Sequence, residues 1–133
     1  MQCPPSDLEL VESVRAFLID ELLPELTGAA AYNTRVAANI LKIVERSLNG
    51  GSNLLSAEKA RLRDVLGGVA DKSYADLNRD LSIGLRTGSI DWNCDTVRTH
   101  MFQTVLGRLG IDNPKYSTYK EMAFPDSKMR SPK

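Results

Sequence analysis

Apolar residues recur at helical spacing along most of this chain. The first such segment begins with a capping-box pattern, Ser6 followed three residues later by Glu9, and its apolar positions continue to Leu22 and Leu23. Pro24 ends the segment, because proline has no N–H to continue the helical ladder of hydrogen bonds. The pattern therefore predicts a first helix that stops just before residue 24.

Two further helices are predicted in the next forty residues. The longer runs from about Ala29 to Leu48 and ends at Asn49–Gly51, where two glycines can adopt left-handed dihedral angles. Ser56 then caps a third helix, which ends at Gly67–Gly68. The glycine pairs are interpreted as helix stops.

The last two predicted helices lie in the second half of the chain. Ser73 caps the fourth, which continues to Gly88 and contains Gly84, a position that costs about 1 kcal/mol against alanine unless a neighbouring group needs the space. Asp95 caps the fifth, which ends at Gly110. Each helix has apolar residues at positions that share one face.

The overall expectation is an all-α protein, because no segment shows the alternation typical of a strand. Short connections favour an up-and-down bundle of about five helices. A length of 133 residues predicts a single helical domain over residues 1–116. Residues 117–133 are polar and contain two prolines, so we expect a flexible, loosely attached C-terminal tail.

The charge balance narrows the classes of function. The chain has 17 basic and 17 acidic side chains, which argues against binding to nucleic acid or to anionic lipid by net charge. It has no apolar run long enough to cross a bilayer and no visible export signal. Two cysteines suit a reducing compartment. We therefore expect a soluble, cytoplasmic protein without a membrane or nucleic-acid partner.

Motifs for metal, cofactor or nucleophilic chemistry are absent from the sequence. There is one histidine, no Cys-x-x-Cys and no Glu-x-x-His, so neither a metal nor a cofactor is expected. The glycine pairs lack the flanking residues of a phosphate-binding loop. Enzyme activity stays open, with a non-enzymatic role favoured.

One candidate binding stripe lies on the second helix. Tyr32 and Asn39 fall at the edge of its apolar face, with Arg35 and Arg46 just outside them, so a semi-buried Asn39 is expected between cations. The favoured explanation is structural: Asn39 bonds a backbone group, and the arginines pair with carboxylates of the first helix. The alternative is a site for an anion.

A second stripe, on the fifth helix, contains His100 and Arg108, and the two stripes are candidates to face one groove. For His100 the favoured interpretation is a partly buried imidazole with a backbone or carboxylate partner. Trp92, before this helix, is expected to cover the core. The full set of candidate ligand- or partner-binding residues is Tyr32, Arg35, Asn39, Arg46, His100, Arg108, Asn113 and Tyr116.

Three segments carry a family resemblance: Arg35–Arg46, Leu77–Gly88 and the close Asn113–Tyr116. Together they resemble a small bacterial family of helical domains of unknown function, over about residues 6–116. Members of that family are encoded beside, or fused to, aminoglycoside-phosphotransferase-like kinases and acyl-CoA dehydrogenase-like flavoproteins. The resemblance supplies no catalytic residues.

The resemblance implies an accessory or interaction domain associated with a phosphotransferase-like or acyl-CoA-processing enzyme. A kinase-like or acyl-CoA dehydrogenase-like protein is then the expected partner, and a homo-oligomer is a further candidate assembly. One alternative is a small-ligand binding domain that holds an anionic or CoA-type ligand in an interhelical groove. Another is an enzyme that uses His100 as a general base. A flat apolar patch favours a partner, whereas converging Arg35, Asn39 and His100 in a pocket favour a ligand.

Overall fold

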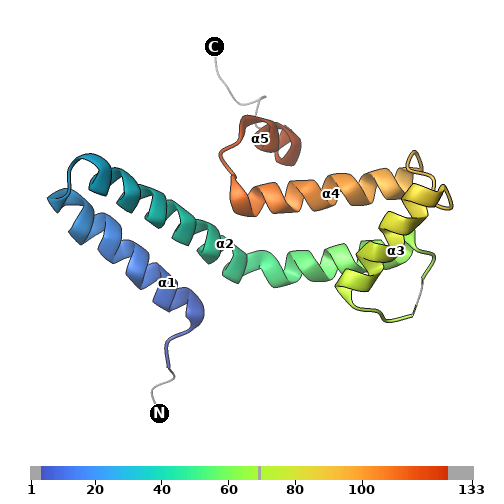
Figure 1. Cartoon of the computed structure of the whole chain (residues 1–133), viewed down its shortest axis with the longest axis horizontal. Coiled ribbons are helices and arrows are strands. Elements are labelled where there is room, and N and C mark those ends of the chain that lie inside the picture. Colours follow the sequence, from blue (N-terminus) through green and yellow to red (C-terminus); the bar gives the residue numbers. More distant parts are fainter. Residues whose placement is uncertain (1–3, 69, 126–133) are drawn as a thin grey trace. The chain divides into compact units, whose positions relative to one another are not determined.

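The computed structural model describes residues 4–68 and 70–125, and in this part of the chain it contains five α-helices and no strand (Figure 1). The all-α prediction is confirmed. The helices are α1 (Asp7–Ala16), α2 (Gly28–Val65), α3 (Tyr74–Thr87), α4 (Asp95–Asp112) and α5 (Ser117–Ala123). Within the described residues, none of these helices has both the length and the apolar character that crossing a bilayer requires.

Two compact units divide the chain, residues 1–52 and 53–133, and their boundary falls inside α2. The single domain expected over residues 1–116 stays a prediction. Each unit is described by itself below.

The first unit is a helical hairpin of α1 and the beginning of α2, which run antiparallel (Figure 1). The predicted capping box is present: the Ser6 N–H donates to Glu9 Oε2 at 2.7 Å, and the Glu9 N–H donates to Ser6 Oγ at 3.3 Å. After α1 the chain continues as a π-helical turn, Phe17–Leu22, and a 3₁₀ turn, Leu23–Glu25, which contains Pro24. Arg15 and Glu45 form an ion pair between the two helices.

The predicted helix stop at Asn49–Gly51 is wrong, and so is the predicted new start at Ser56. Helix α2 passes through both segments without interruption. Neither Gly50 nor Gly51 has a positive φ angle, and a glycine within a helix lowers its stability by about 1 kcal/mol without ending it. The second glycine pair does end the helix, as predicted: Gly67 and Gly68 have φ angles of 80° and 74°.

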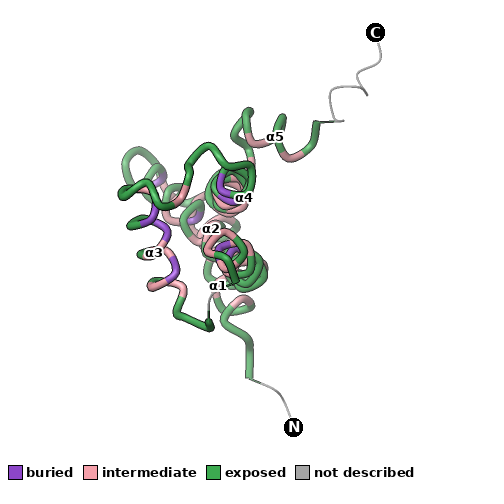
Figure 2. The backbone as a smooth tube through the Cα atoms, turned by 90° about the vertical axis from the view of Figure 1, so that its right-hand side faces the viewer, coloured by how far each residue is buried: buried purple, intermediate pink, exposed green. Residues whose placement is uncertain are grey.

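The second unit has a core of buried leucines, Leu62 from α2 and Leu77 and Leu81 from α3 (Figure 2). Helix α3 is capped as predicted, since the Asp76 N–H donates to Ser73 Oγ at 3.1 Å. Gly84 is where a neighbouring group needs the space: a Cβ there would collide with the Ile90 side chain. The glycine therefore lets the loop after α3 fold back against that helix.

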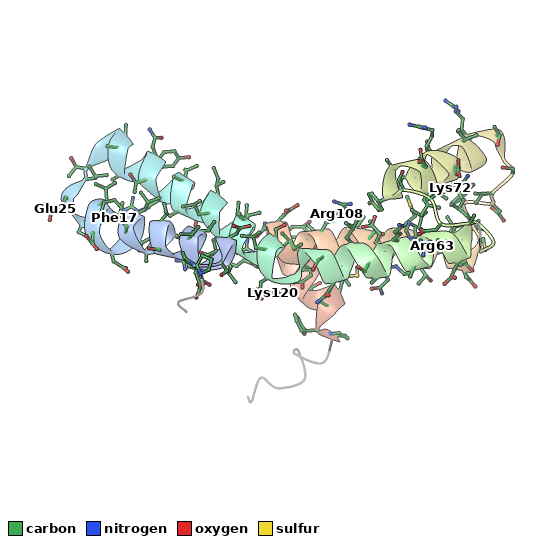
Figure 3. The ribbon with its side chains drawn as sticks, turned by 90° about the horizontal axis from the view of Figure 1, so that it is seen from below. Phe17, Glu25, Arg63, Lys72, Arg108 and Lys120 are labelled. Carbon is green, nitrogen blue, oxygen red and sulfur yellow. The ribbon has the colours of Figure 1, made fainter. Side chains whose placement is uncertain are left out.

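Three ion pairs hold the connection between α2 and α3 at one end of the second unit, where Arg63 and Lys72 lie (Figure 3). One of them joins Lys59 Nζ of α2 to Asp71 Oδ1 at 3.3 Å. Arg63 pairs with Asp71, and Lys72 Nζ contacts Asp80 Oδ2 at 2.6 Å. All of these groups are partly or largely exposed, so solvent screens the attraction within each pair.

The fifth predicted helix, α4, starts at Asp95, with Cys94 rather than Asp95 as its N-cap residue, and it extends two residues beyond Gly110. The segment expected to be a loose tail begins with the short helix α5, whose Tyr119 lies against Gly110. A Cβ on Gly110 would approach the Tyr119 hydroxyl to 2.8 Å, so this glycine makes room for the contact. Residues 126–133 of the predicted tail lie outside the described residues.

Candidate functional site

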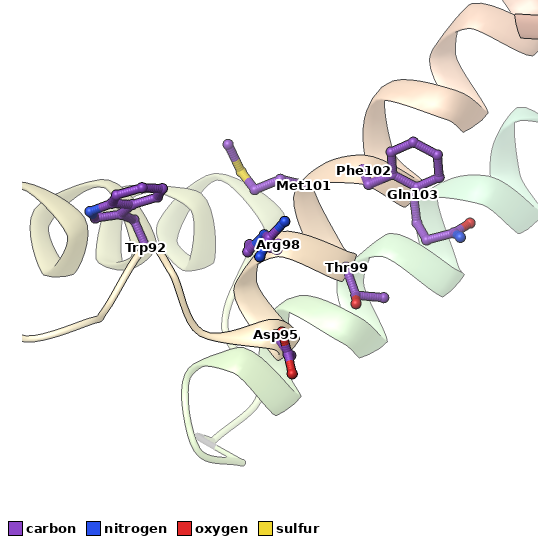
Figure 4. A pocket seen from close by; sticks show the side chains of 7 residues that line it. All are labelled: Trp92, Asp95, Arg98, Thr99, Met101, Phe102 and Gln103. Atoms are coloured by element: carbon purple, nitrogen blue, oxygen red, sulfur yellow. The ribbon is translucent and has the colours of Figure 1, made fainter. Parts of the chain in front are cut away.

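The amino-terminal half of α4 borders two hollows, one open and one more enclosed. The open one, which we call the Trp92 groove, has a volume of about 890 Å³ (Figure 4). It is lined by Trp92, Asp95, Arg98, Thr99, Met101, Phe102 and Gln103. The second, which we call the His100 pocket, has a volume of about 280 Å³. It is lined by Arg61, Asp64, Asp95, Thr96, Thr99 and His100. Asp95 and Thr99 line both.

The Trp92 groove presents large apolar side chains to solvent. Trp92 lies on the loop before α4 and is 72% exposed, while Met101 and Phe102 project from the helix and are about half exposed (Figure 4). Asp95 and Arg98 add one acidic and one basic group beside them. The expectation that Trp92 covers the core is therefore wrong, because its indole makes up part of the surface.

The His100 pocket contains polar atoms that lack hydrogen-bond partners. His100 is only 3% exposed, and its Nδ1 atom accepts or donates no hydrogen bond. The Nε atom of Arg61 is also buried without a partner. Buried polar groups are rarely left unsatisfied, so these two atoms are exceptions in this unit.

Burial lowers the pKa of His100 below its usual value of 6.5, and the positive charge of Arg61 lowers it further, whereas the carboxylate of Glu58 opposes the shift. The imidazole is therefore neutral at pH 7, with one nitrogen as donor and the other as acceptor. His100 was predicted to be partly buried, and the structure buries it more completely than that. A hydrogen-bond partner for Nδ1 is not found in the described part of the chain.

A buried carboxylate lies close to the pocket. Glu58 of α2 is 7% exposed and accepts a short hydrogen bond from the Tyr74 hydroxyl. Arg108 of α4 donates to the same hydroxyl at 2.8 Å and approaches Glu58 Oε2 at 3.5 Å. Burial raises the pKa of Tyr74, and its hydrogen bond to Glu58 adds to the effect. Arg108, a candidate ligand-binding residue, thus balances a buried charge within its own unit.

The candidate residues of the first stripe lie in the first unit, on α2. Tyr32 is 66% exposed, and Arg35 and Asn39 are also exposed, whereas Arg46 is half-buried. The expectation of a semi-buried Asn39 is wrong, because the inward face of α2 is occupied by small residues such as Ala38. An ion pair joins Arg15 of α1 to Glu45 of α2. The predicted pairing of Arg35 and Arg46 with carboxylates of the first helix stays a prediction.

The remaining candidates, Asn113 and Tyr116, form the turn between α4 and α5. The Asn113 N–H donates to the Leu109 carbonyl at 2.8 Å, and the Asn113 carbonyl accepts from the Tyr116 N–H at 3.1 Å. Both residues are exposed. In this turn both residues form hydrogen bonds through their backbone groups. His100 and Arg108 also lie in the second unit. The other four candidates lie in the first unit: Tyr32, Arg35, Asn39 and Arg46.

Sequence analysis missed the residues of α2 that complete the site, Glu58 and Arg61. The false helix start at Ser56 placed Glu58 in the first turn of a separate helix, where acidic residues are common, and Arg61 directly after that turn. A signal was present: Glu58 precedes the buried Leu62 by four residues, and Arg61 precedes Val65 by four. Charged residues at these positions lie on or beside the apolar face of a continuous helix.

Among the described residues, no group of three or more His, Cys, Asp or Glu side chains is arranged to hold a metal ion. The hollows around α4 offer hydrogen bonds, charge and apolar surface. An arrangement of this kind is suited to binding.

Comparison with known families gives a match, over residues 24–116, to a family described as Domain of unknown function (DUF6285). The matched residues include all of α2, α3 and α4, and with them both hollows and the cluster around Glu58. Searches of curated proteins and of solved structures give no match. Because the match covers more than half of its length, the chain belongs to this family of helical domains of unknown function.

Proposed function

We propose that this protein is an accessory interaction domain that docks onto an enzyme through the Trp92 groove. The observation that carries the proposal is the exposure of Trp92 beside Met101 and Phe102 on a groove with a polar edge. Tryptophan is among the side chains that contribute most to protein–protein binding, and methionine adapts to surfaces of varied shape.

The composition of the groove also indicates the chemistry of its partner. Interfaces of this kind have an apolar centre and a polar rim. Here Asp95, Arg98 and Gln103 supply a rim with both signs of charge. The partner is therefore an apolar protein segment flanked by charged residues. We place this segment on a phosphotransferase-like or acyl-CoA-processing enzyme, the protein class implied by the family resemblance.

The test compares three tagged forms of the full chain: wild type, Trp92→Ala and Ile83→Ala. Ile83 is an exposed apolar residue of the same unit outside the groove, so it is a matched control. Co-purification from the native host, followed by quantitative mass spectrometry, is expected to recover an enzyme of either class with wild type and with Ile83→Ala.

The purified pair is then studied by calorimetry. Trp92→Ala is expected to weaken binding at least tenfold, about 1.4 kcal/mol, because it removes a central anchor. Equal binding by the two variants would contradict docking at the groove. Recovery of neither enzyme class would contradict the assignment of the partner.

A second candidate function is favoured by the unpartnered atoms of the His100 pocket. Arg61, the Thr96 hydroxyl and a neutral His100 offer hydrogen-bond donors to a small polar ligand, while Asp64 and Asp95 oppose a purely anionic one. A volume of about 280 Å³ lies just below the usual range for ligand pockets. This volume suits a small molecule or a single functional group and excludes a whole CoA molecule.

Thermal-shift assays with small zwitterionic amino acids test this second candidate, and phosphate and acetate, which are purely anionic, serve as compounds that are expected not to bind. A ligand that fits is expected to raise the melting temperature of the wild-type protein, because it binds only the folded state. Arg61→Ala is expected to remove the shift. If none of these compounds changes the melting temperature, the pocket does not bind ligands of this class.

A further inference from the structure

Four of the six residues that line the His100 pocket are ionisable, and they differ in how far they are buried. Asp64 and Asp95 are exposed, Arg61 is half-buried, and His100 is only 3% exposed. The two carboxylates therefore lie nearest to solvent, at what we call the mouth of the pocket. The guanidinium and the imidazole lie deeper, at what we call its floor.

The packing of α2 against α4 in the second unit explains how the two helices share this pocket. Leu54 of α2 lies against Gly107 of α4, since a Cβ on that glycine would approach the Leu54 side chain to 3.3 Å. Further along α2, Arg61 shares the pocket with His100, which lies nearer the start of α4. The two helices therefore run antiparallel here, and the end of α2 lies beside the beginning of α4 (Figure 1).

The same order of charges follows from the positions of these residues along the helices. Asp64 comes three residues after Arg61 on α2, a rise of about 4.5 Å. Asp95 comes five residues before His100 on α4, a rise of about 7.5 Å. Because the helices are antiparallel, both carboxylates are displaced toward the same end of the pair. The mouth of the pocket is therefore acidic, and its floor carries nitrogen groups.

These charged groups are not paired with one another. In the part of the chain that the structure describes, Asp64, Asp95 and Arg61 take part in none of the ion pairs. Arg61 Nε and His100 Nδ1 are buried and without a hydrogen-bond partner. A neutral imidazole carries its hydrogen on either ring nitrogen, so Nδ1 can donate. The pocket thus offers acceptors at its mouth and donors at its floor.

We propose that the His100 pocket holds a small zwitterion in one orientation, with its ammonium group at Asp64 and Asp95 and its carboxylate at Arg61 and His100. This orientation rests on the second candidate function, ligand binding in this pocket, and is independent of docking at the Trp92 groove. A molecule of the size of an unsubstituted small amino acid suits the volume of about 280 Å³.

The two levels of charge also determine which small molecules the pocket rejects. A pure anion would meet the two carboxylates of the mouth, and like charges brought together oppose binding. A pure cation would be attracted to the mouth but would leave the floor atoms of Arg61 and His100 without partners. A zwitterion alone meets complementary groups at both ends.

Nuclear magnetic resonance titration of the full chain with L-alanine, propionate and ethylamine tests the proposal. Propionate is alanine without the ammonium group, and ethylamine is alanine without the carboxylate. His100 is the only histidine in the sequence, so its ring signals report directly on the floor of the pocket. Alanine is expected to shift these signals and to bind at least tenfold more tightly than either of the other two compounds.

A pair of double variants tests which residues receive the ammonium group. Asp64→Asn with Asp95→Asn removes the negative charge of the mouth and is expected to bind propionate at least tenfold more tightly than the wild type does. Asp71→Asn with Asp80→Asn makes the same change in net charge outside the pocket and is expected to keep the wild-type preference for alanine. Circular dichroism checks that both proteins stay helical, and the titrations of the wild type do not depend on either variant.

The outcomes separate this proposal from the function on which it rests. Equally tight binding of propionate or ethylamine would overturn the proposed orientation, although the pocket would still be a ligand site. Unchanged propionate binding in the folded Asp64→Asn, Asp95→Asn variant would overturn the assignment of the ammonium group. If none of the three compounds binds, the second candidate function fails and the proposal fails with it. Trp92→Ala is expected to bind alanine as the wild type does, because Trp92 does not line this pocket.

Discussion

Glu58 is a buried acidic residue, and two neighbouring side chains stabilise its charge. The Tyr74 hydroxyl donates a hydrogen bond to its carboxylate, and Arg108 supplies a positive charge from α4. A buried carboxylate without such partners would cost several kcal/mol. These three residues thus link α2, α3 and α4 by polar contacts that depend on one another.

Tyr74→Phe is expected to lower the free energy of unfolding by about 1–3 kcal/mol, because it leaves a buried carboxylate and Arg108 each short of a partner. Urea denaturation followed by circular dichroism measures the change. Tyr116→Phe, at an exposed tyrosine in the turn before α5, is the control and is expected to change stability by less than about 0.5 kcal/mol. Equal effects would show that the Tyr74 hydroxyl contributes nothing specific.

The pH dependence of stability reports on His100. Its pKa in the folded protein is lower than 6.5, so below that pH the unfolded chain binds more protons than the folded one. Stability is therefore expected to fall as pH is lowered from about 7.5 to about 5.5, with a slope of at most about 1.4 kcal/mol per pH unit.

Thermal or urea unfolding at several pH values measures this slope. His100 is the only histidine in the sequence, so His100→Gln is expected to flatten the profile in this range. A His100→Gln variant that keeps the wild-type slope would assign the titration to another group. Burial is the main cause of the lowered pKa of His100, Arg61 lowers this pKa further, and Glu58 opposes the shift.

Helix α2 shows where local sequence signals are insufficient. Asn49–Gly51 has the composition of a helix stop, and Gly67–Gly68 has the same composition, yet only the second pair has positive φ angles. Helical residues on both sides of Gly50 and Gly51 continue the ladder, which outweighs the cost of about 1 kcal/mol for each glycine. Sequence composition therefore identified candidate stops, and tertiary context decided between them.

Gly50→Ala is expected to stabilise the protein by up to about 1 kcal/mol, since φ at this position is not positive and a Cβ there meets nothing within 4 Å. The melting temperature measures the gain. Gly67→Ala is the opposite control: its φ of 80° strains any residue with a side chain, so destabilisation is expected. If Gly50→Ala lowered the melting temperature, this result would support the predicted helix stop at this position.

Most of the fold was accessible from the sequence, whereas the site was accessible only in part. Caps such as Ser6 and Ser73 and apolar periodicity identified the helical segments, because both signals are local. The site depends on contacts between segments distant in sequence, such as Arg108 with Glu58. Candidate His100 was found by its residue type, but its neighbour Arg61 was not, since only tertiary packing brings them together.

The division of the chain at Ser52 and Asn53 has a consequence for how the whole molecule melts. A protein of this length ordinarily unfolds in one all-or-none transition. Here residues 49–53 are Asn, Gly, Gly, Ser and Asn, all weak helix formers, so the helical hydrogen bonds nearest the boundary are the easiest in α2 to open. The coupling of unfolding between the two units is therefore weakest at residues 49–53. Scanning calorimetry is expected to give a van't Hoff enthalpy smaller than the calorimetric enthalpy, the signature of two separately melting parts; equality of the two would mean that α2 transmits unfolding across its full length.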